Sequence, residues 1–171
     1  KKFKKQYFFI PLQTYNDFQV KVHSNYESIE EFIEEVLISF SKYASNEKLL
    51  FFKHHPIDRG RKNYYKTIIE MANKLNIQSR VKVIYDVHLP TLLKNAIGTI
   101  VINSTVGLSS LHHKTPVLCL GESIYNLKGL TAYNININDF WDLKLKVNYQ
   151  NYLNFRSYLI ENTQINDHFY R

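Results

Sequence analysis

Five short apolar runs along the chain alternate with segments in which apolar residues recur every three or four positions. The runs are nearly continuous in apolar residues instead of alternating with polar ones, as is typical of strands buried on both faces of a sheet. They cover Tyr7–Leu12, Lys48–Lys53, Val81–Tyr85, Thr99–Ile102 and Pro116–Leu120.

Helical spacing is clearest over residues 29–43, where apolar positions line one side and four glutamates the other. Ser28 is expected to cap this helix, and the acidic first turns suit the N-terminal end of its dipole. Further helices are predicted over Asn63–Leu75, Leu89–Asn95, Leu108–His113, Asn138–Leu143 and Tyr149–Glu161.

This alternation of strands and helices predicts an α/β fold: a Rossmann-like parallel sheet with helices on both faces. In such sheets ligands bind beyond the carboxyl ends of the strands. The candidate ligand-binding segments are therefore those that follow the predicted strands, residues 13–17, 54–59, 86–88 and 103–105.

The length of 171 residues indicates one domain, residues 1–171, and the net charge of +7 favours anionic partners. Residues 1–6 are expected to be a disordered basic terminus, and residues 132–171 to form helices that pack on the domain. The chain starts at Lys1 with a strand-like run close behind. We therefore expect it to be part of a longer two-domain protein whose other half precedes it.

The single cysteine, Cys119, lies in an apolar run and is expected to be a buried structural thiol. One cysteine excludes an internal disulfide and a cysteine-based zinc site. No apolar run approaches eighteen residues and no signal peptide is visible, which favours the cytoplasm. The chain has neither a Walker A motif nor a G-x-G-x-x-G motif, which disfavours ATP or NAD binding through those loops.

The stretch that follows the fourth run is the strongest candidate for a phosphate site. Ser104 and Thr105 stand where a strand turns into a helix, so hydroxyls and backbone N–H groups would gather there. Gly107 would let a phosphate or another backbone come close. The alternative is helix capping without a ligand, because capping uses the same geometry.

A second candidate site follows the run that ends at Lys53. His55 precedes Pro56, which favours an extended backbone and presents the imidazole for a hydrogen bond to a ligand. The alternative is a partly buried histidine satisfied by the backbone. His54 would point to the opposite face. Lys53, Asp58 and Arg59 could add charge to the site, or could form a salt bridge within the loop.

Five ordered segments together resemble one known family, over residues 7–131. They comprise Phe9–Gln13 with Asn16, Asp17, Gln19, His23 and Ser24; Phe52–Gly60; His88–Leu93; Asn103–Leu111; and Thr115–Val117 with Gly121 and Gly129–Thr131. On these residues the chain resembles the bacterial capsule polysaccharide biosynthesis family, which includes the β-Kdo transferases of capsule lipid-anchor assembly.

The resemblance implies the C-terminal, nucleotide-sugar-binding half of a GT-B-type glycosyltransferase. The implied donor is CMP-Kdo, transferred with retention to a lipid-linked acceptor. By the same resemblance, His55 and Pro56 would contact the nucleotide, Ser104 and Thr105 would hold its phosphate, and Asp17 would be the nucleophile. No cofactor or metal is expected, and no nucleic acid partner. Capsule-assembly proteins and the inner face of the inner membrane are candidate contacts. The chain alone is expected to be inactive, because a cleft enzyme needs both walls.

Alternatives remain open for several residues and for the function. Asp17 follows Asn16 and could simply serve a turn. Gln13, His88 and Glu122 could line the cleft or be ordinary loop residues. The donor could instead be a CDP-polyol or a UDP-sugar. A non-catalytic, basic polyanion-binding scaffold is disfavoured, because most aromatic residues lie within apolar runs.

Overall fold

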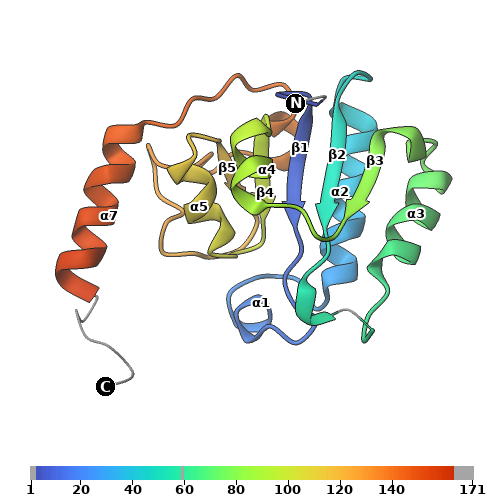
Figure 1. The fold of residues 1–171 in the computed structure, drawn as a ribbon, viewed down its shortest axis with the longest axis horizontal. Coiled ribbons are helices and arrows are strands. Elements are labelled where there is room, and N and C mark those ends of the chain that lie inside the picture. The colour runs from blue at the N-terminus through green and yellow to red at the C-terminus, as the bar shows by residue number, and fades with distance from the viewer. Residues whose placement is uncertain (1–2, 59, 164–171) are drawn as a thin grey trace.

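The computed structural model describes residues 3–58 and 60–163 and contains a five-stranded parallel sheet (Figure 1). The strand order is β3-β2-β1-β4-β5, and every pair of neighbours is parallel. The strands are β1 (Tyr7–Pro11), β2 (Leu49–Lys53), β3 (Val81–Ile84), β4 (Gly98–Val101) and β5 (Val117–Cys119). The predicted α/β class and all five strands are confirmed.

The strand order reverses between β1 and β4. From β1 the chain builds outward through β2 and β3, and then returns to β4 on the other side of β1. The connections on the two sides therefore leave in opposite directions at the carboxyl ends of β1 and β4. A crevice at such a switch point is where open α/β sheets bind their ligands.

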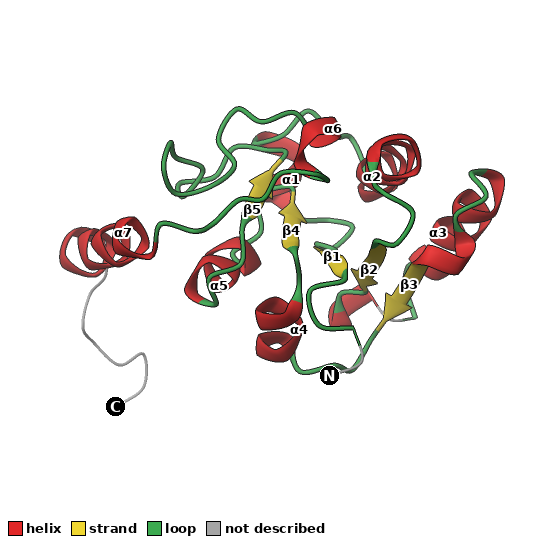
Figure 2. Ribbon diagram, turned by 90° about the horizontal axis from the view of Figure 1, so that it is seen from above, coloured by secondary structure: helices red, strands yellow, loops and turns green. Residues whose placement is uncertain are grey.

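Helices cover both faces of the sheet (Figure 2). Two short 3₁₀ turns, η1 (Pro56–Asp58) and η2 (Gln78–Arg80), lie in the connections. The helices are α1 (Phe18–Val22), α2 (Ile29–Tyr43), α3 (Tyr64–Lys74), α4 (Leu89–Asn95), α5 (Val106–His112), α6 (Ile137–Phe140) and α7 (Tyr149–Thr163).

Side chains of the central strand β1 alternate between two hydrophobic cores. Phe8 and Ile10 join the large core under α2, α3 and α6, whereas Tyr7 and Phe9 join the core under α4. All five residues of β1 are buried. This burial on both faces explains why the strand sequences are continuous apolar runs.

Most predicted helices are confirmed, with Ser28 as the N-cap of α2, where its side chain accepts a hydrogen bond from the Glu31 N–H. The predictions missed α1, which has only five residues and too short a pattern to show a periodicity. They also began α5 two residues late, because Val106 and Gly107 belong to it. The helix expected over Asn138–Leu143 is the shorter α6.

The two ends of the chain differ in part from expectation. Residues 1 and 2 lie outside the described residues, but Lys5, expected in a disordered terminus, donates from its Nζ to the Ala96 carbonyl at 2.6 Å. Within residues 132–163, Trp141 is buried in the large core against Phe8 and Phe40. Helix α7 lies beside α5 at one end of the molecule and buries only Tyr152 (Figure 1).

Across residues 3–58 and 60–163, no helix combines the length and the apolar character that crossing a membrane requires.

Cys119 is buried at the end of β5, as predicted for a structural thiol. Burial raises the pKa of this thiol to about 11. Burial likewise raises the pKa of the Tyr7 phenol to about 12. Both groups therefore stay protonated and uncharged in neutral solution.

We expect iodoacetamide at about pH 8 to alkylate Cys119 at least ~100-fold more slowly in the native chain than in urea, because the raised pKa depletes the thiolate. The pKa of Cys119 in the folded chain exceeds the ordinary value of 9.0, so burial of the neutral thiol favours the folded state. This stabilisation is complete below pH 9.0 and is lost as the pH rises toward 11. Alkylation rates, and urea unfolding followed from about pH 8 to 11, test both statements. Equal rates in native and unfolded protein would contradict the first of them.

Candidate functional site

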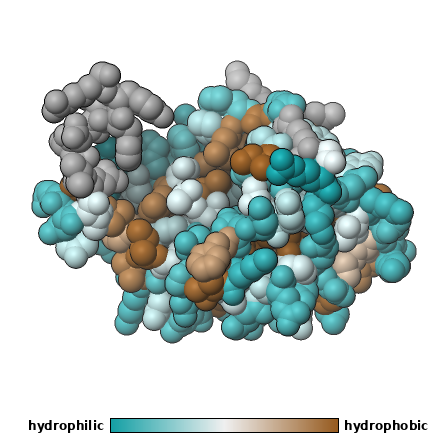
Figure 3. All heavy atoms as spheres, turned by 90° about the horizontal axis from the view of Figure 1, so that it is seen from below, coloured by the Kyte–Doolittle hydropathy of each residue, from teal (hydrophilic) through white to brown (hydrophobic). Residues whose placement is uncertain are grey.

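A pocket of about 500 Å³ opens at the carboxyl edge of the sheet, at the switch point between β1 and β4. This volume lies in the usual range of small-molecule sites, roughly 300–1,000 Å³. Figure 3 views this end of the molecule and shows hydrophobic patches among hydrophilic atoms. The walls of the pocket come from the ends of three strands and from α4. They are Pro11–Thr14 with Asp17 and Gln19 at the end of β1, Lys53–Ile57 at the end of β2, Asn103–Val106 after β4, and Leu89 of α4.

The pocket brings together seven of the predicted site residues from separate parts of the sequence. They are Gln13, Asp17, Lys53, His55, Pro56, Ser104 and Thr105. Parallel strands place their carboxyl ends at one edge of the sheet, which explains why residues some ninety positions apart become neighbours.

A pair of side-chain amides joins the β1 and β4 walls. Gln13 Nε2 donates to Asn103 Oδ1 at 2.9 Å, and the Asn103 backbone N–H donates to Gln13 Oε1 at 3.2 Å. Asn103 Nδ2 also donates to the Gln19 carbonyl at 2.8 Å. Gln13 is only 7% exposed, so these bonds fix its orientation beside the pocket.

Asp17 is both a pocket residue and the N-cap of α1. Its Oδ1 accepts the Gln19 N–H at 2.9 Å, and its Oδ2 accepts Gln13 Nε2 at 3.0 Å. The turn chemistry considered for this residue is thus present, because the Asp17 N–H also donates to the Thr14 carbonyl. Two N–H donors hold the half-buried carboxylate in one orientation at the pocket wall.

His55 presents one ring nitrogen for a ligand. The Ile57 N–H donates to His55 Nδ1 at 3.3 Å, so the neutral ring carries its proton on Nε2. Nε2–H is then the atom that can donate to a bound nucleotide. The half-buried His55 lines the pocket next to Pro56.

His54 is buried, and both of its ring nitrogens face backbone carbonyls of the loop that carries His55. Its Nδ1 lies 3.0 Å from the His55 carbonyl and its Nε2 lies 3.1 Å from the Lys62 carbonyl. The ring stacks on Tyr85, with 5.6 Å between centroids. We therefore assign His54 to the scaffold of the loop that carries His55.

The turn after β4 offers hydroxyls more than free amides. The Asn103 N–H is bonded to Gln13 Oε1, and the N–H groups of Val106 and Gly107 donate to Ser104 Oγ and to the Ser104 carbonyl. Thr105 is the N-cap residue of α5 and its side chain makes no capping bond. An anion here would meet the Ser104 and Thr105 hydroxyls first. The expectation of exposed amides at this turn is therefore not met at Asn103, Val106 and Gly107, whose N–H groups are bonded within the protein.

Gly107 serves a close contact within the protein and does not line the pocket. A Cβ at this position would lie 2.6 Å from two ring carbons of Tyr125. Tyr125 is buried and its hydroxyl donates to the Ser104 carbonyl. The predicted close approach at Gly107 exists, but the group that approaches is this ring, so the assignment of Gly107 to the nucleotide site is replaced by a packing role.

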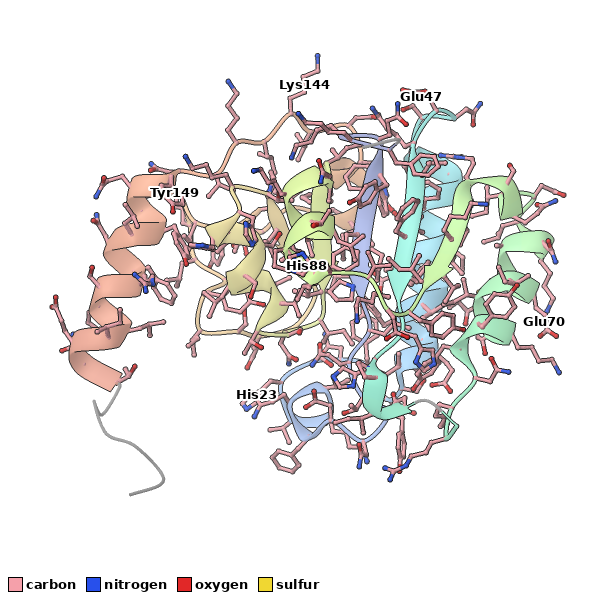
Figure 4. The ribbon with its side chains drawn as sticks, in the orientation of Figure 1. His23, Glu47, Glu70, His88, Lys144 and Tyr149 are labelled. Atoms are coloured by element: carbon pink, nitrogen blue, oxygen red, sulfur yellow. The ribbon has the colours of Figure 1, made fainter. Side chains whose placement is uncertain are left out.

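Two further predicted residues, His88 and Glu122, do not line this pocket. Exposed His88 precedes α4, where its Nδ1 lies 3.0 Å from Thr91 Oγ1 (Figure 4). Glu122 is exposed and lies 3.5 Å from His23 Nδ1. Arg59 lies outside the described residues. Asn103 is the residue that sequence reasoning passed over individually, although its place directly after the fourth run was a usable signal.

Among the residues that the structure describes, no three or more His, Cys, Asp or Glu side chains are grouped so that they could hold a metal ion.

Comparison with known proteins gives consistent matches. The model of a family described as capsule polysaccharide biosynthesis protein matches residues 1–170. The "Capsule polysaccharide export protein KpsS" of Escherichia coli is 37% identical over 165 residues, which cover 96% of this chain and 42% of that protein. The "Capsule polysaccharide modification protein LipB" of Neisseria meningitidis serogroup B is 36% identical over 166 residues, covering 96% of this chain and 39% of LipB.

A solved structure supports the fold. KpsC of Thermosulfurimonas dismutans, described as a beta Kdo 2,7 transferase, superposes with a TM-score of 0.57 at 21% identity, covering 84% of this chain and 43% of that one. The chain thus spans about two fifths of the length of the relatives it matches.

Proposed function

Because the chain belongs to the capsule polysaccharide biosynthesis family, we propose that it is the donor-binding part of a glycosyltransferase that transfers Kdo from CMP-Kdo to a lipid-linked acceptor with retention. The observation that carries the proposal is the pocket at the β1/β4 switch point. It gathers a carboxylate, an imidazole and two hydroxyls from three strand ends. A nucleotide sugar needs this combination, because it has a base, a charged phosphate and a reacting anomeric carbon.

Each pocket wall takes one part of the donor in this proposal. The Ser104 and Thr105 hydroxyls donate to the phosphate, and the cationic Lys53 adds positive charge to the same pocket. His55 donates from Nε2 to the nucleotide. The contacts to phosphate strengthen as CMP departs with the electron pair of the broken glycosidic bond.

In this proposal Asp17 acts as the nucleophile of a two-step displacement. One of its oxygens forms a bond to the anomeric carbon while the bond from that carbon to the phosphate oxygen breaks, which yields a glycosyl ester and CMP. The acceptor hydroxyl then attacks the same carbon, releases the Asp17 carboxylate and gives up its proton to a base or to water. Two inversions produce net retention. The bonds from Gln13 and Gln19 hold the attacking carboxylate in place.

Titration calorimetry with CMP, CDP and UDP tests the choice of donor. We expect CMP to bind this chain more tightly than UDP. If UDP bound at least about tenfold tighter than CMP, a gap of about 1.4 kcal/mol, the assignment to CMP-Kdo would fail. Binding of acidic polysaccharide that weakens steeply with salt, together with no CMP binding, would favour a scaffold role.

Removing both hydroxyls in Ser104→Ala/Thr105→Ala is expected to weaken CMP binding at least about tenfold, because each hydroxyl loses a hydrogen bond to a charged phosphate. Ser109→Ala in the same helix is the matched control, since Ser109 lies outside the pocket. Calorimetry on folded samples measures the difference. Unchanged affinity in the double variant would contradict the placement of the phosphate.

A further inference from the structure

We propose that Asp58 is a positioning residue that fixes the spacing between two walls of the donor pocket, although it does not line the pocket itself. The inference rests on the proposed function, because the pocket is the one assigned to the nucleotide sugar. It concerns the segment after β1, which carries Asp17, and the segment after β2, which carries His55. These two walls must keep a set distance if one ligand is to touch both.

Regular pairing between β1 and β2 stops before the functional side chains begin. The register pairs Pro11 with Lys53, and the Leu12 N–H donates to the Lys53 carbonyl at 3.0 Å. Beyond this bond the two segments diverge, one toward α1 and the other into η1 (Figure 1). Some other contact must therefore hold them together at the pocket.

Asp58 supplies that contact. Its Oδ2 accepts the Tyr15 backbone N–H at 3.0 Å, across forty-three positions of sequence. Tyr15 lies in the turn closed by the bond from the Asp17 N–H to the Thr14 carbonyl at 3.1 Å. The Asp58 carboxylate is thus hydrogen-bonded to the turn whose last residue is Asp17, the proposed nucleophile.

The backbone of Asp58 is itself held firmly. Its N–H donates to the His55 carbonyl at 3.2 Å, and its carbonyl accepts the N–H groups of Arg61 and Lys62, each at 3.0 Å. A side chain anchored in this way transmits the position of the His55 loop to the turn at Tyr15.

Because Asp58 is removed from solvent, its hydrogen bond to the Tyr15 N–H is energetically important. Asp58 is fully buried, and its Oδ1 has no hydrogen-bond partner among the described residues. Burial of a carboxylate is costly unless its oxygens are hydrogen-bonded, so the bond from the Tyr15 N–H to Oδ2 matters for keeping Asp58 in place. On the opposite side, Gln13 ties the start of the Asp17 segment to Asn103 after β4. The Asp17 segment is thereby held between both neighbouring strand ends, with Asp58 on the β2 side.

The ring of Tyr15 is a separate matter from its amide. The side chain is 41% exposed, and its only described partner is the Lys62 ammonium, 5.9 Å from the ring centroid. Tyr15→Ala therefore keeps the N–H donor and removes the ring. This variant is a control for effects that do not involve the hydrogen bond between the Tyr15 N–H and Asp58 Oδ2.

The experiment compares CMP affinity, by calorimetry, in the wild type, Asp58→Ala, Asp58→Asn and Tyr15→Ala. Asp58→Ala removes the acceptor and is expected to weaken CMP binding at least about tenfold, whereas Asp58→Asn keeps an oxygen for the Tyr15 N–H and should stay within about threefold. Tyr15→Ala should bind as the wild type does. Glu47→Gln, at the opposite end of the sheet (Figure 4), controls for loss of one negative charge.

Amide hydrogen exchange of residue 15 gives a readout that does not depend on the ligand. We expect faster exchange in Asp58→Ala and wild-type protection in Asp58→Asn. If Asp58→Ala does not fold, Tyr15→Pro replaces it, because it removes the donor at an exposed turn where proline is tolerated. That variant is expected to weaken CMP binding relative to Tyr15→Ala.

The outcomes separate the two proposals. If the wild type binds no CMP, the proposed function fails and the inference falls with it. If the wild type binds CMP and Asp58→Ala, folded, binds it equally well, the positioning role alone is overturned. A lower melting temperature of Asp58→Ala with unchanged affinity would reduce Asp58 to a purely structural residue.

Discussion

Replacing Asp17 with asparagine in the cell's own gene is expected to abolish capsule synthesis while the protein stays folded and abundant. Asparagine caps helices about as well as aspartate, and its oxygen can still accept the Gln19 N–H that Asp17 Oδ1 accepts at 2.9 Å. What the substitution removes is the anionic oxygen that would attack the anomeric carbon. Loss of a covalent nucleophile lowers turnover by at least about a thousandfold.

The measurement is the amount of capsular polysaccharide per cell, with the level of the protein followed by immunoblot. CMP affinity of the purified chain should change little, because the residues proposed to contact the phosphate and the nucleotide lie on other walls of the pocket. Asp142→Asn, an exposed carboxylate outside the pocket, is the matched control. Ordinary capsule levels in the Asp17→Asn strain would contradict the proposed role of Asp17.

Gly107→Ala is expected to be among the most destabilising single substitutions in the chain. The added methyl carbon would lie 2.6 Å from ring carbons of Tyr125, well inside contact distance, and Tyr125 is buried with its hydroxyl bonded to the Ser104 carbonyl. The ring has to move and its hydrogen bond is strained or lost. Overpacking combined with a weakened buried hydrogen bond costs about 3 kcal/mol.

Urea unfolding of the purified chain measures this loss, and Ser109→Ala in the same helix should change stability by less than about 0.5 kcal/mol. The double variant Gly107→Ala/Tyr125→Ala should be more stable than the sum of the single changes predicts, since the smaller partner leaves room for the methyl group. Strict additivity would contradict the proposed clash. Because Tyr125 holds the Ser104 carbonyl, Gly107→Ala should also weaken CMP binding.

The site residues that could be predicted are polar residues that directly follow strands which lie next to one another in the sheet. Ser104, Thr105 and His55 follow apolar runs in the sequence, and all three line the pocket together with Asp17. The family resemblance added Asp17, and the family match over residues 1–170 confirms that resemblance. His88 and Glu122 also follow predicted strands, but outside the reversal between β1 and β4 they lie away from this pocket.

Side-chain partnerships were the part that sequence could not supply. Gly107 was assigned to a ligand because a glycine reveals that something comes close, without revealing what. Only the folded chain shows that a ring eighteen positions later takes that space. For Asp58 the sequence suggested two roles, charge in the site or a salt bridge within the loop. The structure shows a further one, because its carboxylate accepts a backbone N–H from another loop.

The amino-acid pattern by itself determined the parallel α/β architecture and the edge of the sheet at which a ligand would bind, because both follow from periodicity and strand direction, which are local properties. The tertiary structure alone decided which strand ends share a pocket, which amides remain open there and how the pocket walls are tied together. Those features depend on contacts between residues far apart in the chain, and no local pattern encodes such distances.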